Sequence, residues 1–170
     1  MDDKCISVIG LGLLGGAIAA RLCELGWQVR GSDVDSARRD AAAAAGAKIF
    51  ASSIESAAGA TRILLSLPNS EVVAEVIKVL RPGLKPNLVI LDTTTGDPDF
   101  AQAQAAELQQ RGVKYLETNV IGSSAQARKG DGTLLVGGEA AAIDVFQDLF
   151  AARAERWFAI GPSGAAARMK

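Results

Sequence analysis

Short apolar runs alternate with longer amphipathic segments along most of the chain. Runs of three to five residues rich in Val, Ile and Leu are typical of strands that are buried on both faces of a parallel sheet. The regular alternation of strands and helices predicts an open, mostly parallel, doubly wound α/β sheet with helices on both faces. The predicted strands cover residues 6–9, 28–32, 48–50, 62–67, 88–91, 114–117, 133–136 and 156–160.

The segments between these runs carry apolar residues at helical spacing. In the first of them, Leu14, Ile18, Leu22 and Leu25 share one face, and Gly26 can end the helix. The polar, glycine-rich residues 122–132 are predicted to form a loop. Further helices are predicted over residues 35–45, 70–80, 98–110 and 140–151, with a short helix capped by Ser52 or Ser53 and another beginning near residue 165.

The first strand leads directly into the pattern G-x-G-x-x-G at Gly10, Gly12 and Gly15. In such a strand–turn–helix unit, the first glycine permits a tight turn and the second lets a phosphate approach the backbone, while the third allows close helix packing. The N-terminus of the next helix offers free N–H groups and its positive dipole end to phosphates. About 20 residues further on, Asp33 ends the second strand, where it can accept hydrogen bonds from ribose hydroxyls. These features predict a Rossmann-like dinucleotide site. The alternatives are a purely structural glycine turn and a solvated acid at Asp33.

Other polar segments also follow predicted strands. In a doubly wound sheet, ligands bind outside the carboxyl ends of the strands. Hydroxyls and backbone amides gathered there suit a small polar or carboxylate substrate beside a nicotinamide. Ordinary turn chemistry is the alternative for Thr93–Thr95, and a simple strand stop is the alternative for Leu67–Pro68. The segments at this edge are residues 10–15, Asp33, residues 67–69, residues 92–98 and residues 119–124.

Composition limits the possible functions further. The chain has 18 basic and 19 acidic residues and a net charge of −1, so no nucleic-acid footprint or polybasic membrane patch is expected. No apolar stretch reaches the length that spans a membrane. Without histidine, the chain has no histidine metal ligand and no Ser-His or Cys-His pair, and we predict no metal site. Cys5 and Cys23 are expected to be buried free thiols, which indicates a reducing cytoplasm.

Five motifs in order resemble the nucleotide-binding domain of the β-hydroxyacid dehydrogenases. This family includes 3-hydroxyisobutyrate dehydrogenase, tartronate semialdehyde reductase and the more distant 6-phosphogluconate dehydrogenase. The resemblance covers essentially the whole chain, and five ordered motifs are far more specific than the glycine pattern alone. The motifs are residues 9–15, residues 66–69, residues 92–98, residues 117–123 followed by 132–138, and residues 161–170.

The resemblance implies an NAD-dependent oxidoreductase. Its reaction would transfer a hydride between the nicotinamide and a small β-hydroxyacid or the corresponding semialdehyde or keto form. Residues 1–164 would form the dinucleotide-binding domain, and residues 165–170 would begin the helix that leads to the family's C-terminal helical domain, which we expect to be absent here. That domain closes the cleft and forms the dimer, so we expect a homo-oligomer for the full-length form. We expect weak or no turnover for this chain alone.

The resemblance also assigns roles to single residues. Lys170 would be the catalytic general acid/base on the substrate oxygen, whereas without the resemblance it would be taken as a solvated lysine. Thr94, Gly122 and Ser123 would bind the substrate. The residues implied to bind the cofactor are Gly10, Leu11, Gly12, Leu13, Leu14, Gly15, Asp33, Leu67, Pro68, Asn69 and Thr95.

One motif departs from the family pattern. The family commonly has Asp-Ala-Pro-Val-Ser-Gly-Gly, whereas residues 117–123 read Glu-Thr-Asn-Val-Ile-Gly-Ser. Ile121 cannot give the hydrogen bond of the usual serine, although Ser123 could supply a hydroxyl from two positions on. Thr94 replaces another usual serine and keeps its hydroxyl. Two alternatives therefore stay open: a reductase of another carbonyl or imine substrate, and a non-catalytic dinucleotide-binding module.

We predict NAD rather than NADP as cofactor, because a carboxylate at Asp33 repels a 2′-phosphate. Family members that use NADP tend to have Asn-Arg where this chain has Asp33–Val34, although Arg38 and Arg39 on the next helix could still reach a phosphate. The double variant Asp33→Asn with Val34→Arg should shift the preference towards NADP. The ratio of NADH and NADPH dissociation constants, measured by nicotinamide fluorescence, checks this. An unchanged ratio would show that Asp33 is not the ribose acid.

Overall fold

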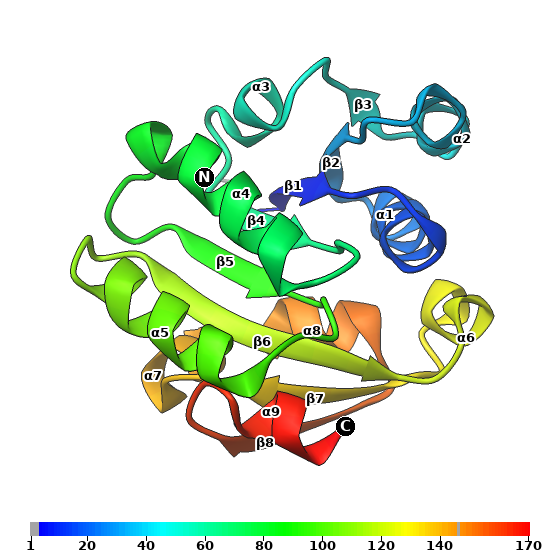
Figure 1. The fold of residues 1–170 in the computed structure, drawn as a ribbon. Coiled ribbons are helices and arrows are strands. Elements are labelled where there is room, and N and C mark those ends of the chain that lie inside the picture. Colours follow the sequence, from blue (N-terminus) through cyan, green and yellow to red (C-terminus); the bar gives the residue numbers. More distant parts are fainter. Residues whose placement is uncertain (1–3, 146) are drawn as a thin grey trace.

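The computed structural model describes residues 4–145 and 147–170 of the chain. Within these residues, eight strands form a single sheet in the order β3-β2-β1-β4-β5-β6-β7-β8 (Figure 1). Neighbouring strands pair in parallel except for β6 and β7, which are antiparallel. The strands are β1 (Cys5–Ile9), β2 (Gln28–Ser32), β3 (Lys48–Ile49), β4 (Arg62–Leu65), β5 (Val89–Asp92), β6 (Lys114–Ile121), β7 (Thr133–Gly137) and β8 (Arg156–Gly161).

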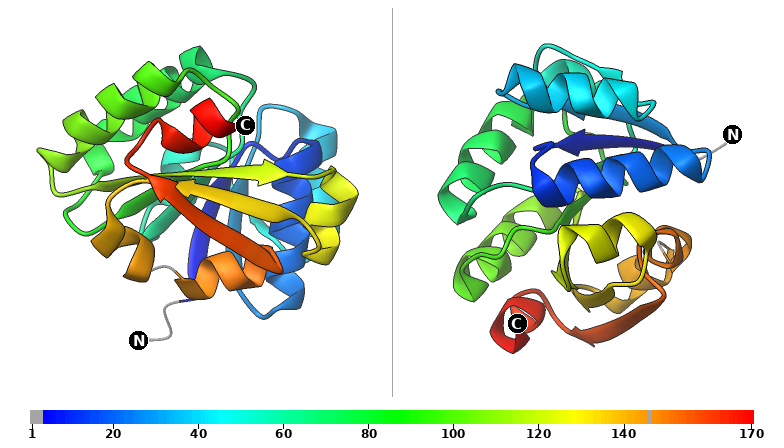
Figure 2. Two further views of the ribbon diagram at one scale, coloured as in Figure 1. Left: turned by 90° about the horizontal axis from the view of Figure 1, so that it is seen from below. Right: turned by 90° about the vertical axis from the view of Figure 1, so that its right-hand side faces the viewer.

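Helices cover both faces of the sheet (Figure 2). Buried residues of α1, α6 and α8 belong to the core cluster on one face, and those of α4 and α5 belong to the cluster on the other. The helices are α1 (Leu13–Glu24), α2 (Ser36–Ala44), α3 (Ser53–Ala57), α4 (Ser70–Leu80), the 3-10 helix η1 (Arg81–Gly83), α5 (Pro98–Gln109), α6 (Ser124–Lys129), α7 (Ala140–Val145), α8 (Gln147–Arg153) and α9 (Ala165–Met169).

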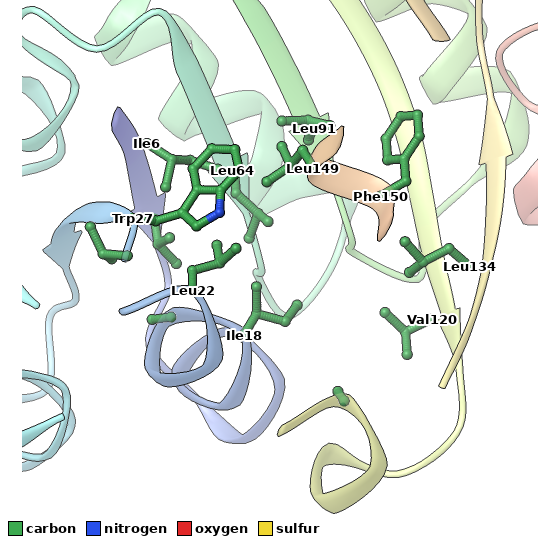
Figure 3. Close-up of a cluster of buried hydrophobic side chains, with 14 of the residues drawn as sticks. Ile6, Ile18, Leu22, Trp27, Leu64, Leu91, Val120, Leu134, Leu149 and Phe150 are labelled. Carbon is green, nitrogen blue, oxygen red and sulfur yellow. The ribbon is translucent and has the colours of Figure 1, made fainter. Parts of the chain in front are cut away.

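The central strands β4 and β5 are buried at every position, and their residues are mainly apolar because both of their faces are covered. Successive side chains of a strand point to opposite faces, so Leu64 of β4 joins one core cluster while Ile63 and Leu65 join the other. Figure 3 shows the first cluster, which also contains Ile18 and Leu22 of α1. The predicted fold class, a mostly parallel doubly wound α/β sheet, is confirmed.

The main differences from the prediction follow β5. Strand β6 continues to Ile121 instead of ending at Glu117, because β7 returns antiparallel along its C-terminal half. Residues 122–132 are predicted to form a loop, and this prediction is wrong because Ser124–Lys129 form the helix α6. The helix begins at a capping box formed by Ser123 and Gln126. The cap supplies hydrogen bonds that the polar composition of the segment did not reveal.

Three smaller predictions can also be compared with the structure. The helix predicted over residues 140–151 is described as α7 and α8, and residue 146 between them lies outside the described residues. Cys5 and Cys23 are free thiols, but they are only partly buried. In the described parts of the chain, no helix is both long enough and apolar enough to cross a membrane.

Candidate active site

The strand order reverses direction at β1, which lies between β2 and β4. The connections that leave β1 and β4 therefore go to opposite faces of the sheet, and in such sheets ligands bind in the crevice outside the carboxyl ends of the strands at this switch point. The glycine loop, Asp33 and residues 67–69 all follow strands at this edge. The structure thus brings together the segments that the sequence predicted to bind a dinucleotide.

Two of the three motif glycines are required by close backbone packing. Gly10 has a φ of +90°, and a Cβ on it would lie 2.2 Å from the Ser66 carbonyl oxygen. A Cβ on Gly15 would lie 2.0 Å from the carbonyl oxygen of Gly10. The turn therefore crosses directly over the end of β4, and α1 packs directly against the turn.

Gly12 differs from the other two motif glycines, because a Cβ there would make only ordinary contacts with one side chain. The atom nearest to a Cβ built there is the Arg38 guanidinium nitrogen, at 3.6 Å. A groove of about 410 Å³ begins here between α1 and α2. Gly12 is also the N-cap of α1 and makes no side-chain cap bond, so backbone N–H groups of the first turn remain available to a phosphate.

The three leucines of the glycine loop have different surroundings. Leu11 is buried in the core and Leu14 packs against it, so these two residues present mainly their backbone to the crevice. Leu13, in contrast, has 87% of its side chain exposed at the first position of α1.

Asp33 is a fixed part of the loop rather than a solvated acid. Its side chain is only 4% exposed. One carboxylate oxygen accepts a hydrogen bond from the Leu11 N–H at 2.6 Å, and the other accepts from the Asp35 N–H at 2.9 Å. The Arg38 guanidinium lies 3.8 Å from the first oxygen. Asp33 therefore ties the end of β2 to the glycine loop, a role that the sequence analysis did not predict.

A side-chain hydrogen bond joins the turns after β4 and β5. The Leu67 N–H donates to the Thr94 hydroxyl oxygen at 3.2 Å, and Thr94 is buried. Pro68 follows, and the Asn69 side chain caps α4 by accepting from the Val72 N–H. The Asn69 carboxamide oxygen thus has a structural partner, and the Thr94 side chain is itself hydrogen-bonded to Asp92.

Asp92 holds the turn that contains Thr94. Its buried carboxylate accepts hydrogen bonds from the Thr94 N–H at 2.8 Å and from the Tyr115 hydroxyl at 2.6 Å. Burial raises the pKa of the Asp92 carboxyl, and the hydrogen bonds from Tyr115 and Thr94 oppose that rise. Burial and the neighbouring Asp92 charge raise the pKa of Tyr115 well above its usual value. The sequence analysis gave no role to this pair, although an Asp two residues before Thr94 is a recognisable turn signal.

Lys170 reaches the same turn from a distant part of the chain. Its ammonium donates a hydrogen bond to the Thr95 hydroxyl at 2.8 Å, across 75 residues of sequence. Thr95 is exposed and Lys170 lies at the end of α9. Partial burial lowers the pKa of the Lys170 ammonium. The lysine, Thr94 and the Leu67 turn are therefore neighbours at one edge of the sheet.

Gly122 and Ser123 lie at the end of β6, where the chain turns into α6. The Ser123 hydroxyl accepts from the Gln126 N–H and contacts the Gln126 side-chain oxygen, which also accepts from the Ser123 N–H. Ser123 is thus engaged in capping α6 rather than in contact with the Thr94 turn. Ile121, just before them, is 46% exposed. Across the ranges that the structure describes, no three or more acidic or cysteine side chains are grouped to hold a metal ion.

Comparisons with known proteins agree with this geometry. The model of the family described as the NAD binding domain of 6-phosphogluconate dehydrogenase matches residues 5–161. The chain belongs to the β-hydroxyacid dehydrogenase family. The match covers the N-terminal NAD-binding domain of that family, as the sequence motifs predicted, and NAD is the cofactor of such domains.

Individual relatives support the same assignment. The chain is 32% identical over 165 residues to the NAD-dependent L-serine dehydrogenase of Pseudomonas aeruginosa, covering 95% of this chain and 55% of that protein. It is 28% identical over 172 residues to the L-threonate dehydrogenase of Cupriavidus necator, covering 99% of this chain and 58% of that protein. The chain thus spans somewhat more than half of the length of these family members.

A solved structure shows the same fold in a family member. The Mycobacterium tuberculosis 3-hydroxyisobutyrate dehydrogenase, determined with L-serine, superposes with a TM-score of 0.94 at 26% sequence identity. The superposition covers 97% of this chain and 57% of that structure.

The different surroundings of Gly12 and Gly15 predict different effects of one added methyl group. Gly15→Ala should lower the free energy of unfolding by about 3 kcal/mol or more, because the Cβ clashes with backbone. Gly12→Ala should change the free energy of unfolding by less than about 1 kcal/mol, because the added methyl group meets no backbone atom. It should nevertheless weaken NADH binding, because the methyl group stands where a phosphate would approach the backbone. Urea unfolding and NADH titration of both variants check this, and unimpaired NADH binding by Gly12→Ala would place the phosphates elsewhere.

Asp92 predicts a pH dependence of stability. As pH rises above the ordinary carboxyl pKa of 3.8, the unfolded state ionises before the folded state, whose pKa is raised. As pH rises, the free energy of unfolding of the wild type should therefore fall relative to that of Asp92→Asn. The difference between the two proteins should stop changing once pH exceeds the folded-state pKa of Asp92. Urea unfolding of both proteins between pH 3.5 and 8, a window of roughly four units around these values, measures the difference. A difference that is independent of pH would contradict the raised pKa.

Proposed function

We propose that this chain is the cofactor-binding part of an NAD-dependent dehydrogenase that acts on a small β-hydroxyacid or its semialdehyde or keto form. The observation that carries the proposal is the contact of Lys170 with the turn that contains Thr94 and Thr95. The Thr94 hydroxyl oxygen also accepts a hydrogen bond from the Leu67 N–H, which lies beside the glycine loop. A proton-transferring lysine and a dinucleotide crevice therefore share one edge of the sheet.

The residues of the crevice fit a dinucleotide. The open space at Gly12 and the free N–H groups at the start of α1 would receive the pyrophosphate, within a loop formed by residues 10–15. Asp33 would accept from the ribose hydroxyls, because its carboxylate is held in place by two backbone N–H groups. Leu67, Pro68, Asn69 and Thr95 would line the nicotinamide end.

Bound NAD supplies the hydride acceptor or donor. This chain's own residues then have to move a proton, since hydride addition to a carbonyl leaves an alkoxide and alcohol oxidation releases a proton. Lys170 would exchange that proton with the substrate oxygen, and partial burial lowers its pKa in the direction that this role needs. Thr94 would contact the substrate through the second lone pair of its hydroxyl oxygen, while Gly122 and Ser123 would line the far side of the pocket.

The substrate class follows from the relatives, whose names include L-serine and L-threonate dehydrogenases. One observation favours a different substrate class, namely the exposed Ile121 where the family motif has serine. A less polar carbonyl or imine would suit that side chain better than a carboxylate. A non-catalytic dinucleotide-binding module is the third possibility. We further propose a cytoplasmic location and a homo-oligomeric full-length form.

The variant Lys170→Met separates catalysis from cofactor binding. We expect turnover of NAD with L-serine, L-threonate or 3-hydroxyisobutyrate to fall by roughly 10²–10⁴-fold, the usual contribution of a general acid/base. The NADH dissociation constant should stay within about two-fold, because the glycine loop and Asp33 are untouched. Turnover is measured in the longest natural form of the protein that contains this chain. Unchanged turnover in Lys170→Met would overturn the catalytic assignment, and tight NADH binding without turnover by the wild type would favour the non-catalytic module.

A further inference from the structure

The short helix α9, which ends at Lys170, has no cap of its own. Its N-cap residue is Gly164, with a φ of +93° and no side-chain hydrogen bond. The first N–H groups of a helix need partners when they are buried. Figure 2 and the contacts of α9 place it against β6, β7 and α5, so these groups face the interior of the molecule.

Glu117 of β6 provides the missing cap. Its buried carboxylate accepts a hydrogen bond from the Gly164 N–H. Burial raises the pKa of Glu117, while hydrogen bonds from the backbone N–H groups of Gly164, Ala167 and Ala166 lower it. A carboxylate is also the favourable charge at a helix N-terminus. Gly137 on β7 leaves the necessary room, since a Cβ there would lie 2.6 Å from the Glu117 carboxylate.

Asn119 makes a second connection to the same helix. It lies two residues after Glu117, on the same face of β6, and is 1% exposed. Its carboxamide oxygen accepts from the Ala167 N–H at 3.2 Å, and its nitrogen donates to the Thr94 carbonyl at 3.2 Å. The opposite orientation would set like groups against each other, so the neighbours define the orientation.

These contacts form a closed path around the candidate catalytic group. Asn119 joins the Thr94 turn to Ala167, one helical turn before Lys170, and Lys170 returns to Thr95 of the same turn. We propose that Glu117 and Asn119 are positioning residues that fix α9 so that the Lys170 ammonium is held at the Thr94–Thr95 turn. This inference rests on the proposed function of Lys170. Asn119 stands where the family motif has proline, whose side chain could make neither bond.

The test uses Asn119→Ala and Glu117→Ala with three readouts: kcat with the small hydroxyacids named above, the NADH dissociation constant, and the Lys170 pKa from NMR of its side chain. We expect kcat to fall by roughly 10- to 100-fold, the scale of an ångström-sized misplacement, with NADH affinity within about two-fold. The Lys170 pKa should move towards its ordinary value, and the Ala167 amide should exchange faster with solvent. Glu117→Gln keeps one acceptor and the volume, so it should retain more activity than Glu117→Ala and serves where the latter does not fold.

Two control variants separate positioning from general stability. Leu80→Ala removes core packing at the C-terminal end of α4 and should lower the melting temperature without moving kcat or the Lys170 pKa. Asp99→Asn removes an exposed ion pair between α5 and Arg168 of α9 and should have little effect. The proposal is overturned if Asn119→Ala and Glu117→Ala leave kcat and the Lys170 pKa unchanged, as Leu80→Ala is expected to do. If Lys170→Met keeps full turnover, the proposed function fails instead, and the NMR readouts still decide whether the two residues fix the helix.

Discussion

The structure of the site depends on the close backbone packing at the switch point of the sheet. The turn at Gly10 crosses the Ser66 carbonyl, and the helix at Gly15 rests on the Gly10 carbonyl, at distances that exclude any side chain. This packing places the start of α1 directly at the carboxyl ends of β1 and β4. Because the rigid contacts lie beneath the loop, the open side at Gly12 is free for a ligand. One motif thus combines two glycines that the fold requires and one, Gly12, that the packing does not require.

Strand β6 makes the second half of the site possible. Its apolar residues Leu116 and Val120 join one core cluster, while Tyr115, Glu117 and Asn119 alternate with them and face α5 and α9. Buried polar side chains are costly unless they are paired, and each of these three is paired. Their partners are the last residue of β5, the turn after it, and the backbone at the start of α9. The polar face of β6 therefore determines where two segments distant in sequence meet.

The sequence predicted the features that depend on local signals. Strand runs, the glycine turn and a serine cap at residue 52 or 53 each follow from a few adjacent residues, and the structure has them, with Ser52 as the cap. Features that depend on distant partners were missed. Strand β6 is longer than predicted because β7 pairs antiparallel with its C-terminal half. The glycine-rich segment contains a helix because Gln126 and Ser123 cap it. The roles of Glu117 and Asn119 could not be predicted, because their partners lie more than 40 residues away or across the sheet.

The adenosine end of the crevice shows how local structure bears on cofactor preference. Arg38 lies within reach of both Gly12 and Asp33, so a basic group is present where a 2′-phosphate would come. Arg38 is about half exposed, however, whereas the Asp33 carboxylate is almost fully buried and held by the Leu11 and Asp35 N–H groups. The half-exposed Arg38 is paired with the Asp33 and Asp35 carboxylates, whereas the Asp33 carboxylate cannot turn away from a phosphate without losing both backbone hydrogen bonds. The fixed negative charge therefore outweighs the exposed positive one, and the geometry favours NAD.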